Sequence, residues 1–163
     1  MKVSLFKTLW GHEGSISEAA DLVTEAGFSG IEGMYPEDPF EKASFAEVLA
    51  ETNLEFIAEV STATTPGLYV PAPGKSAIEH LDTLRSGIEN ALPIKPRFIN
   101  TMCGSDAWTE AEAIRFYSAI PDLEAEYEIA ISAETHRGRY LNSPWLTGVS
   151  LKEVPDLKLT CDF

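Results

Sequence analysis

The alternation of short apolar segments with amphipathic segments is the feature that most constrains the fold of this 163-residue chain. The apolar segments are typical of β-strands, and the segments between them are typical of helices. We expect strands at residues 2–9, 29–34, 54–61, 97–102, 129–134 and 156–162. Strands and helices that alternate at this spacing predict a parallel sheet.

The expected helices have recognisable starts. Ser15 with Glu18, Ser44 with Glu47 and Thr109 with Glu112 have the spacing of capping boxes, and a further helix spans about 76–92. The last helix begins at Ser143, with Pro144 at its first helical position. No linker or shift in composition divides the chain, so we expect residues 1–163 to form a single domain.

The distribution of side chains along the fifth expected strand distinguishes between two parallel architectures. Ser132, Glu134 and His136 share one face of this strand, whereas Ile131 and Ala133 share the other. An open doubly wound sheet carries helices on both faces and should be apolar on both. A polar face that is richest at the C-terminal strand end favours a (β/α)8 TIM barrel. A complete barrel needs eight strands and about 250 residues, so the fold class that we predict is an incomplete α/β barrel of about six βα units.

The charge of the chain excludes one class of partner. It carries 26 acidic and 12 basic residues and a formal net charge of −14, which argues against binding nucleic acid through its phosphates. No signal peptide or apolar run long enough for a membrane span is present, which indicates a cytoplasmic protein without a membrane partner. Cys103 and Cys161 lie far apart in the sequence and are expected to be reduced thiols.

Glu134 is the first candidate functional residue. A carboxylate at the C-terminal end of a strand can bind a divalent cation and can take a proton from a carbon atom next to a carbonyl. Asp162 occupies the matching position on the next strand, and two neighbouring carboxylates repel each other unless a cation or a proton lies between them. The alternative for Glu134 is an ion pair with Arg137 or Arg139 in a surface loop.

Other strand ends supply candidate substrate-binding residues. His136 could donate to or accept from a substrate hydroxyl, and Arg137 could bind a substrate oxygen or phosphate. Trp10 could form an apolar wall against a sugar ring. Glu32 and Asn100 end two further strands. For each residue an ordinary structural role remains open: a solvated loop histidine, a surface ion pair, a core tryptophan, or hydrogen bonds to a neighbouring loop.

With these residues assembled, the chain resembles the xylose isomerase-like TIM-barrel superfamily of sugar phosphate isomerases and epimerases. The resemblance covers essentially the whole chain and is carried by "GIEG" at 30–33, "IN" at 99–100, "GSDAW" at 104–108, "ETHRG" at 134–138, "SPW" at 143–145 and "PDLKLTCDF" at 155–163. It implies a site for Mn²⁺, Mg²⁺, Co²⁺ or Zn²⁺, with Glu134 and Asp162 as two of the metal ligands and Glu134 as catalytic residue. The remaining ligands in the family are a His or Gln on strand seven and a Glu on strand eight.

Two departures from the family pattern bear on function. Relatives often continue with a Ser-His pair and two further strands, and they often have a histidine where this chain has Met102. We therefore expect a truncated barrel. The function implied is a metal-dependent isomerase or epimerase of a sugar or small hydroxy-carbonyl compound, acting through an enediolate. The alternative is a non-catalytic truncated barrel or sugar-binding fragment, and an apurinic endonuclease-like hydrolase ranks last. Unpaired sheet edges leave a homo-oligomer open.

Overall fold

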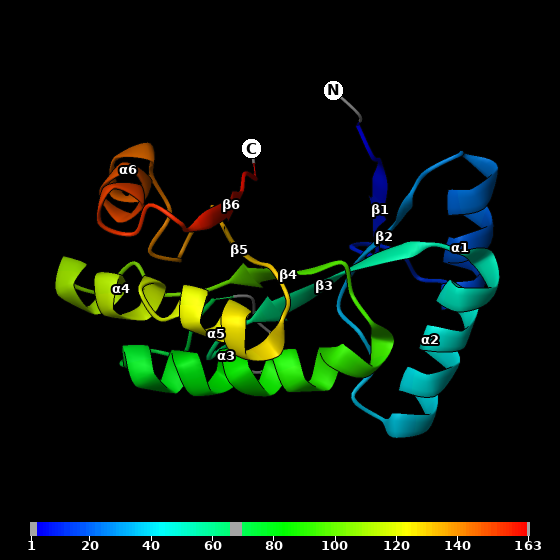
Figure 1. The fold of residues 1–163 in the computed structure, drawn as a ribbon, viewed down its shortest axis with the longest axis horizontal. Coiled ribbons are helices and arrows are strands. Elements are labelled where there is room, and N and C mark those ends of the chain that lie inside the picture. Colours follow the sequence, from blue (N-terminus) through cyan, green and yellow to red (C-terminus); the bar gives the residue numbers. More distant parts are fainter. Residues whose placement is uncertain (1–2, 66–69, 163) are drawn as a thin grey trace. The chain divides into compact units, whose positions relative to one another are not determined.

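The computed structural model describes residues 3–65 and 70–162, and it confirms the alternation of strands and helices (Figure 1). The start of the first expected strand, the centre of the loop before the third helix and Phe163 lie outside the described residues. The elements are β1 Phe6–Thr8, α1 Ile16–Glu25, β2 Gly30–Gly33, α2 Pro39–Thr52, β3 Glu55–Ser61, α3 Ala77–Ala91, η1 Leu92–Ile94, β4 Phe98–Met102, α4 Glu110–Tyr117, α5 Ile120–Tyr127, β5 Ile131–Glu134, α6 Pro144–Glu153 and β6 Lys158–Thr160.

The strands are hydrogen-bonded to one another in sequence order, from β1 to β6. The chain divides into two compact units, one of residues 1–59 and 89–98 and the other of residues 60–88 and 99–163. In the first unit β2 is parallel to both β1 and β3, and in the second β5 is parallel to both β4 and β6. Strands joined in sequence order through helices are the first six βα units of an incomplete barrel.

Most of the predicted helix starts are confirmed. Ser15 and Thr109 form complete capping boxes, with the Ser15 and Thr109 hydroxyls accepting from the backbone three residues later. Ser143 caps α6, with a proline at the first helical position. The prediction that the second helix opens at Ser44 is wrong, because α2 begins five residues earlier. Asp38 caps it there by accepting from two backbone N–H groups, and the proline that follows favours the first helical turn.

Each unit has its own apolar core. In the first, Phe45 of α2 lies edge to face against Phe56 of β3, with ring centroids 5.0 Å apart. In the second, Phe116 and Tyr117 of α4 are fully buried and meet edge to face at 5.2 Å. In β3, Phe56, Ala58 and Val60 share one face and are buried, whereas the polar side chains Glu55, Glu59 and Ser61 lie on the other face.

Gly30 lies where β2 passes between β1 and β3, and it offers a test of this packing. A Cβ atom at this position would overlap the backbone carbonyl of Glu55 and lie 2.6 Å from the ring of Phe6. Because the carbonyl belongs to the neighbouring strand, it cannot move without disturbing the sheet. We expect Gly30→Ala to lower the free energy of unfolding by roughly 2 to 3 kcal/mol, measured by denaturant unfolding.

The matched control for this substitution is Gly148→Ala. Gly148 lies in α6, and a Cβ atom added there would have no neighbouring atom within 4 Å, so the added methyl group meets open space. Alanine is favoured over glycine inside a helix by up to about 1 kcal/mol. This variant should therefore unfold at the same or a higher denaturant concentration, and an equal loss in both variants would contradict the packing argument.

Candidate functional site

Polar side chains gather where β4, β5 and β6 end in the second unit. Asn100 of β4 lies in register with Ser132 of β5, and Glu134 of β5 lies in register with Thr160 of β6. The side-chain amide of Asn100 donates to Oε2 of Glu134 at 2.6 Å, and the hydroxyls of Ser132 and Thr160 lie 2.5 Å apart. The polar face predicted for the fifth strand thus contacts polar side chains of both neighbouring strands.

Glu134 is half-buried, and its environment disfavours the charged carboxylate. Burial raises the pKa of Glu134, and the negative charge of Asp162 raises it further. The hydrogen bond from Asn100 and the positive charges of His136 and Arg139 act in the opposite direction. A carboxylate held with a raised pKa at a strand end can alternate between its charged and neutral forms, which is the property that a general acid or base requires.

Asp162 follows β6 and is exposed. Its backbone is held by Thr135, whose hydroxyl donates to the Asp162 carbonyl at 3.3 Å and accepts from the Asp162 N–H at 3.0 Å. Since its charge influences the pKa of Glu134, the structure brings the two predicted carboxylates into one neighbourhood.

His136 lies two residues beyond the end of β5 and is half-buried. Its Nδ1 is 2.6 Å from the backbone carbonyl of Arg137, so Nδ1 carries the hydrogen and donates it. In the neutral ring this leaves Nε2 with a lone pair, which can accept a hydrogen bond or bind a metal. Arg137 itself is exposed, at the tip of the turn between His136 and Arg139.

Arg139 is the residue that sequence reasoning missed, because it was assigned to a surface ion pair. It is fully buried, and its Nη1 donates to the backbone carbonyl of Thr62 at 2.8 Å and that of Gly104 at 3.4 Å. Gly138 is the sequence feature that could have indicated the burial of Arg139. Its φ of +73° makes a turn directly before Arg139.

His80 of α3 is buried in the same cluster. Its Nδ1 lies 2.7 Å from the hydroxyl of Thr62, and its ring meets Trp108 edge to face at 4.6 Å. Burial, together with the nearby charge of Arg139, lowers the pKa of His80 from 6.5 to about 4. His80 is therefore a neutral structural histidine under ordinary conditions.

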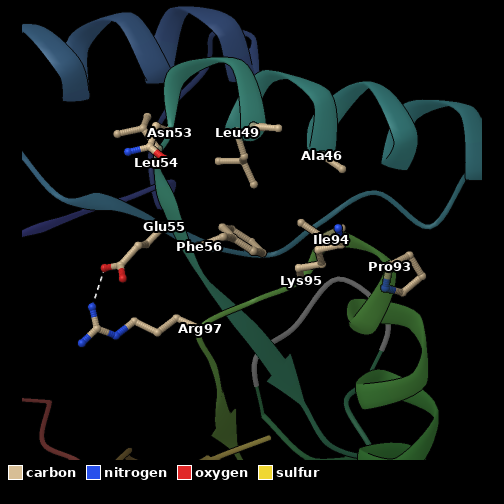
Figure 2. Close-up of a pocket in the computed structure, with 11 residues that line it drawn as sticks. Ala46, Leu49, Asn53, Leu54, Glu55, Phe56, Pro93, Ile94, Lys95 and Arg97 are labelled. Carbon is tan, nitrogen blue, oxygen red and sulfur yellow. Dashed lines mark hydrogen bonds and ion pairs between the residues drawn. The ribbon is translucent and has the colours of Figure 1, made fainter.

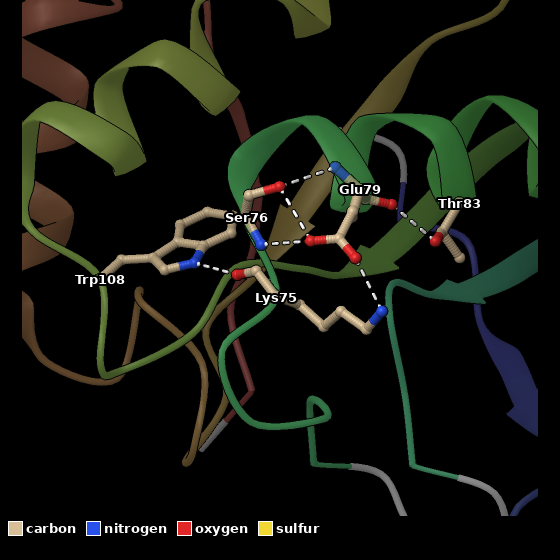
Figure 3. Close-up of polar contacts among 5 residues, drawn as sticks. All are labelled: Lys75, Ser76, Glu79, Thr83 and Trp108. Atoms are coloured by element: carbon tan, nitrogen blue, oxygen red, sulfur yellow. Dashed lines mark hydrogen bonds and ion pairs between the residues drawn. The ribbon is translucent and has the colours of Figure 1, made fainter.

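Trp108 connects the loop after β4 to the start of α3. Its indole N–H donates to the backbone carbonyl of Lys75 at 2.9 Å (Figure 3). Beside that carbonyl, Ser76 and Glu79 form a reciprocal cap on α3, and the ammonium of Lys75 reaches the same glutamate at 2.7 Å. Trp108 thus ties the loop after the fourth strand to the start of α3.

Trp10 and Glu32 belong to the first unit. Trp10 lies in the turn after β1 and is 67% exposed, with its backbone N–H donating to the hydroxyl of Thr8. Glu32 is half-buried in β2, in register with Ile57 of β3. Their participation in one site with Glu134 stays a prediction.

A groove of about 460 Å³ in the first unit is lined by none of these candidates (Figure 2). It opens between the end of α2 and the starts of β3 and β4, and an ion pair between Glu55 and Arg97 stands at its rim. Its lining residues are Ala46, Leu49, Ala50, Asn53, Leu54, Glu55, Phe56, Pro93, Ile94, Lys95 and Arg97. In barrel folds the chemistry lies at the opposite, C-terminal ends of the strands, so we do not assign the candidate site to this groove.

The chemistry of the donor set suits a divalent cation in type but not in number. Carboxylate oxygens from Glu134 and Asp162 and an imidazole nitrogen from His136 are common ligands of Mn²⁺, Mg²⁺ and Zn²⁺. Within residues 3–65 and 70–162, however, no three His, Cys, Asp or Glu side chains are grouped closely enough to hold a metal ion. The residues present therefore fit part of a metal site.

No helix in the described part of the chain is both long and apolar enough to cross a membrane.

Comparison with known proteins shows which solved structures have a similar fold. No family model and no curated protein matches the chain. Among solved structures it is similar to a probable 3-DHS dehydratase of petrobactin synthesis from Bacillus anthracis, with 18% identity and a TM-score of 0.72 over 99% of this chain and 63% of the other. A D-allulose 3-epimerase from Methylomonas sp., in complex with D-allulose, gives 16% identity and a TM-score of 0.72 over 99% and 62%.

A third structure carries the family's name. A xylose isomerase-like TIM barrel protein from Mycobacterium smegmatis, in complex with magnesium, is 14% identical, with a TM-score of 0.65 over 98% of this chain and 63% of that one. The chain thus spans less than two thirds of each of these three structures. The resemblance to the xylose isomerase-like TIM barrels and the prediction of an incomplete barrel are both confirmed at the level of fold.

Proposed function

We propose that the protein is a metal-dependent isomerase or epimerase that acts on a sugar or a small hydroxy-carbonyl compound. The observation that carries the proposal is the position of Glu134, a half-buried carboxylate of raised pKa at the C-terminal end of β5, hydrogen-bonded to Asn100 and influenced by Asp162. Enzymes of this fold hold their chemistry at these strand ends. Neighbours of the same fold include a D-allulose 3-epimerase and a magnesium-bound protein.

The proposed roles follow from the contacts of each residue. Glu134 takes a proton from the carbon atom next to the substrate carbonyl, and Asn100 fixes the carboxylate for this step by donating to its Oε2. Nε2 of His136 accepts a hydrogen bond from a substrate hydroxyl, because Nδ1 is already committed to a backbone carbonyl. Arg137, exposed at the tip of its turn, binds a substrate oxygen, and Trp10 and Glu32 are further candidate substrate contacts.

Glu134 and Asp162 would hold the metal as two of its ligands. A divalent cation there would polarise the substrate carbonyl and stabilise the negative charge of the enediolate. It would also relieve the repulsion between the two carboxylates, which raises the pKa of Glu134 in the metal-free protein.

The test measures exchange of the substrate proton with solvent, which requires no assumption about the product. The chain is incubated with Mn²⁺ in D₂O with a panel of ketoses, aldoses and small hydroxy-carbonyl acids, free and phosphorylated. Deuterium should enter the carbon atom next to the carbonyl of at least one compound, as followed by proton NMR. Absence of exchange across the panel, for a chain that binds Mn²⁺ and sugar, would reject the isomerase and epimerase proposal.

A second candidate function is a non-catalytic sugar-binding fragment. It is favoured by the partial donor set among the described residues. Titration calorimetry with Mn²⁺ separates the two. Stoichiometric binding that disappears in Glu134→Gln favours the enzyme, whereas sugar binding without any metal binding favours the fragment.

A further inference from the structure

We propose that Arg139 is the positioning residue of this site, because its buried guanidinium holds the turn after β5 against the chain segments that follow β3 and β4. The inference deepens the function proposed above and rests on it for the identity of the site. We call the Arg139 guanidinium and the backbone carbonyls to which it donates the clamp. The geometry of the clamp rests on hydrogen bonds and burial alone.

The turn after β5 separates its two arginines. The backbone N–H of Arg139 donates to the carbonyl of His136 at 3.2 Å, and Gly138 adopts a φ of +73° between them. A positive φ at the third residue of such a turn is the requirement of a type II turn, which glycine meets without strain. The result is that Arg137 is exposed at the tip, whereas the side chain of Arg139 is fully buried.

The buried guanidinium connects three strand ends. It is carried on the turn after β5, and its Nη1 donates to the carbonyl of Thr62 after β3 and to that of Gly104 after β4. Thr62 is itself fixed by its N–H, which donates to the carbonyl of Met102 at 3.0 Å, and by the imidazole of His80. Displacing the guanidinium would therefore release the turn and both neighbouring segments at once.

The position of this turn decides the position of two candidate site residues. His136 accepts the hydrogen bond that closes the turn, and Glu134 ends the strand that leads into it. A buried charge is costly unless it is hydrogen-bonded, and carbonyl oxygens accept from a guanidinium without neutralising it. The charge of Arg139 lowers the pKa of Glu134, an effect that an apolar packing residue would not supply.

The test compares Arg139→Met with Arg115→Met, which removes an exposed arginine from α4 of the same unit. Amide hydrogen exchange is read at Thr62 and at residue 139, with the N–H of Leu123 in α5 as reference. In Arg139→Met we expect exchange at the first two amides to rise at least tenfold, with the reference within twofold. Arg115→Met should leave all three unchanged. No change at Thr62 and residue 139, or an equal rise at all three, would overturn the positioning role.

A second measurement links the clamp to the site. Replacing groups that orient metal ligands typically weakens metal affinity roughly 10- to 100-fold, and we expect this loss of Mn²⁺ affinity in Arg139→Met. Equal Mn²⁺ affinity in wild type and variant would overturn the inference while leaving the proposed function in place. If wild type binds no Mn²⁺ but the local exchange rises as described, the metal-dependent function fails and the positioning role is supported.

Arg139→Lys covers the case in which the methionine variant does not fold. Lysine keeps the charge but lacks the planar guanidinium, whose Nη1 donates to both carbonyls. We expect the same two amides to exchange faster than in wild type, by a smaller factor than in the methionine variant where both fold. Exchange identical to wild type in a folded lysine variant would show that charge alone is sufficient and would overturn the clamp.

Discussion

Glu134→Gln is expected to lower the rate of proton exchange at the substrate carbon by a factor of roughly 10² to 10⁴, the usual contribution of a general acid or base. Glutamine keeps the size of the side chain and its hydrogen bond with Asn100 in one amide orientation, but it cannot take up a proton. The measurement is the deuterium incorporation rate at saturating substrate, with the substrate dissociation constant determined separately. A rate within a few-fold of wild type would remove Glu134 from its assigned role.

The matched control is Glu153→Gln, which makes the same chemical change at an exposed position at the end of α6. Its exchange rate should equal that of wild type. A second readout uses pH: a base must be ionised to act, and burial raises the pKa of Glu134. The wild-type rate should therefore fall at acidic pH as Glu134 becomes protonated, and the residual rate of Glu134→Gln should lack that fall.

The carboxylate pair could be predicted from the sequence because strand periodicity is strict. Residues two apart on a strand share a face, so Glu134 follows Ser132 on the polar face without any knowledge of tertiary contacts. The structure adds the partners on neighbouring strands, Asn100 and Thr160, which depend on the register between strands. Register is set by long-range pairing and cannot be read from one segment alone.

Arg139 illustrates the opposite case. An arginine in a polar segment of an acidic chain is most often exposed, and composition gave no reason to place it in the core. Its burial is decided by a turn at Gly138 together with two carbonyls that lie 77 and 35 residues away in the sequence. The start of α2 was misplaced for a local reason: Asp38 with Pro39 competes with the capping pattern at Ser44, and the proline-containing start prevailed.

Different observations support the hydrogen-bonded group of the candidate site and its possible metal ligands. The group at the ends of β4, β5 and β6 is connected by hydrogen bonds within one unit, and its polar contacts are consistent with a site that moves protons. Glu134, Asp162 and His136 supply two carboxylates and an imidazole, which are side chains of the types that bind divalent cations. Among the described residues no three possible metal ligands are grouped closely enough to hold an ion, so the proposed enzyme requires further ligands and metal titration is the decisive measurement.

Acidification is expected to destabilise the chain through His80 before most of its carboxylates contribute. Burial lowers the pKa of His80 from 6.5 to about 4, so between these pH values the unfolded chain binds a proton that the folded chain does not. The stabilisation is fully present above pH 6.5 and is lost as the pH falls towards 4. The free energy of unfolding should drop by about 3 kcal/mol over this window.

The charges around His80 define the controls. Arg139 and Lys75 lower its pKa, whereas Glu79 raises it. His80→Asn keeps a side-chain amide near Thr62 but cannot be protonated, so its unfolding free energy should be lower at pH 7 and should change less between pH 6.5 and 4. His12→Gln removes an imidazole outside the buried cluster and should keep the wild-type slope. The imidazole of His80 can also be titrated directly by NMR. Protonation near pH 6.5 in the folded chain would contradict the prediction, because it would mean that burial between Thr62 and Trp108 does not lower the pKa of His80.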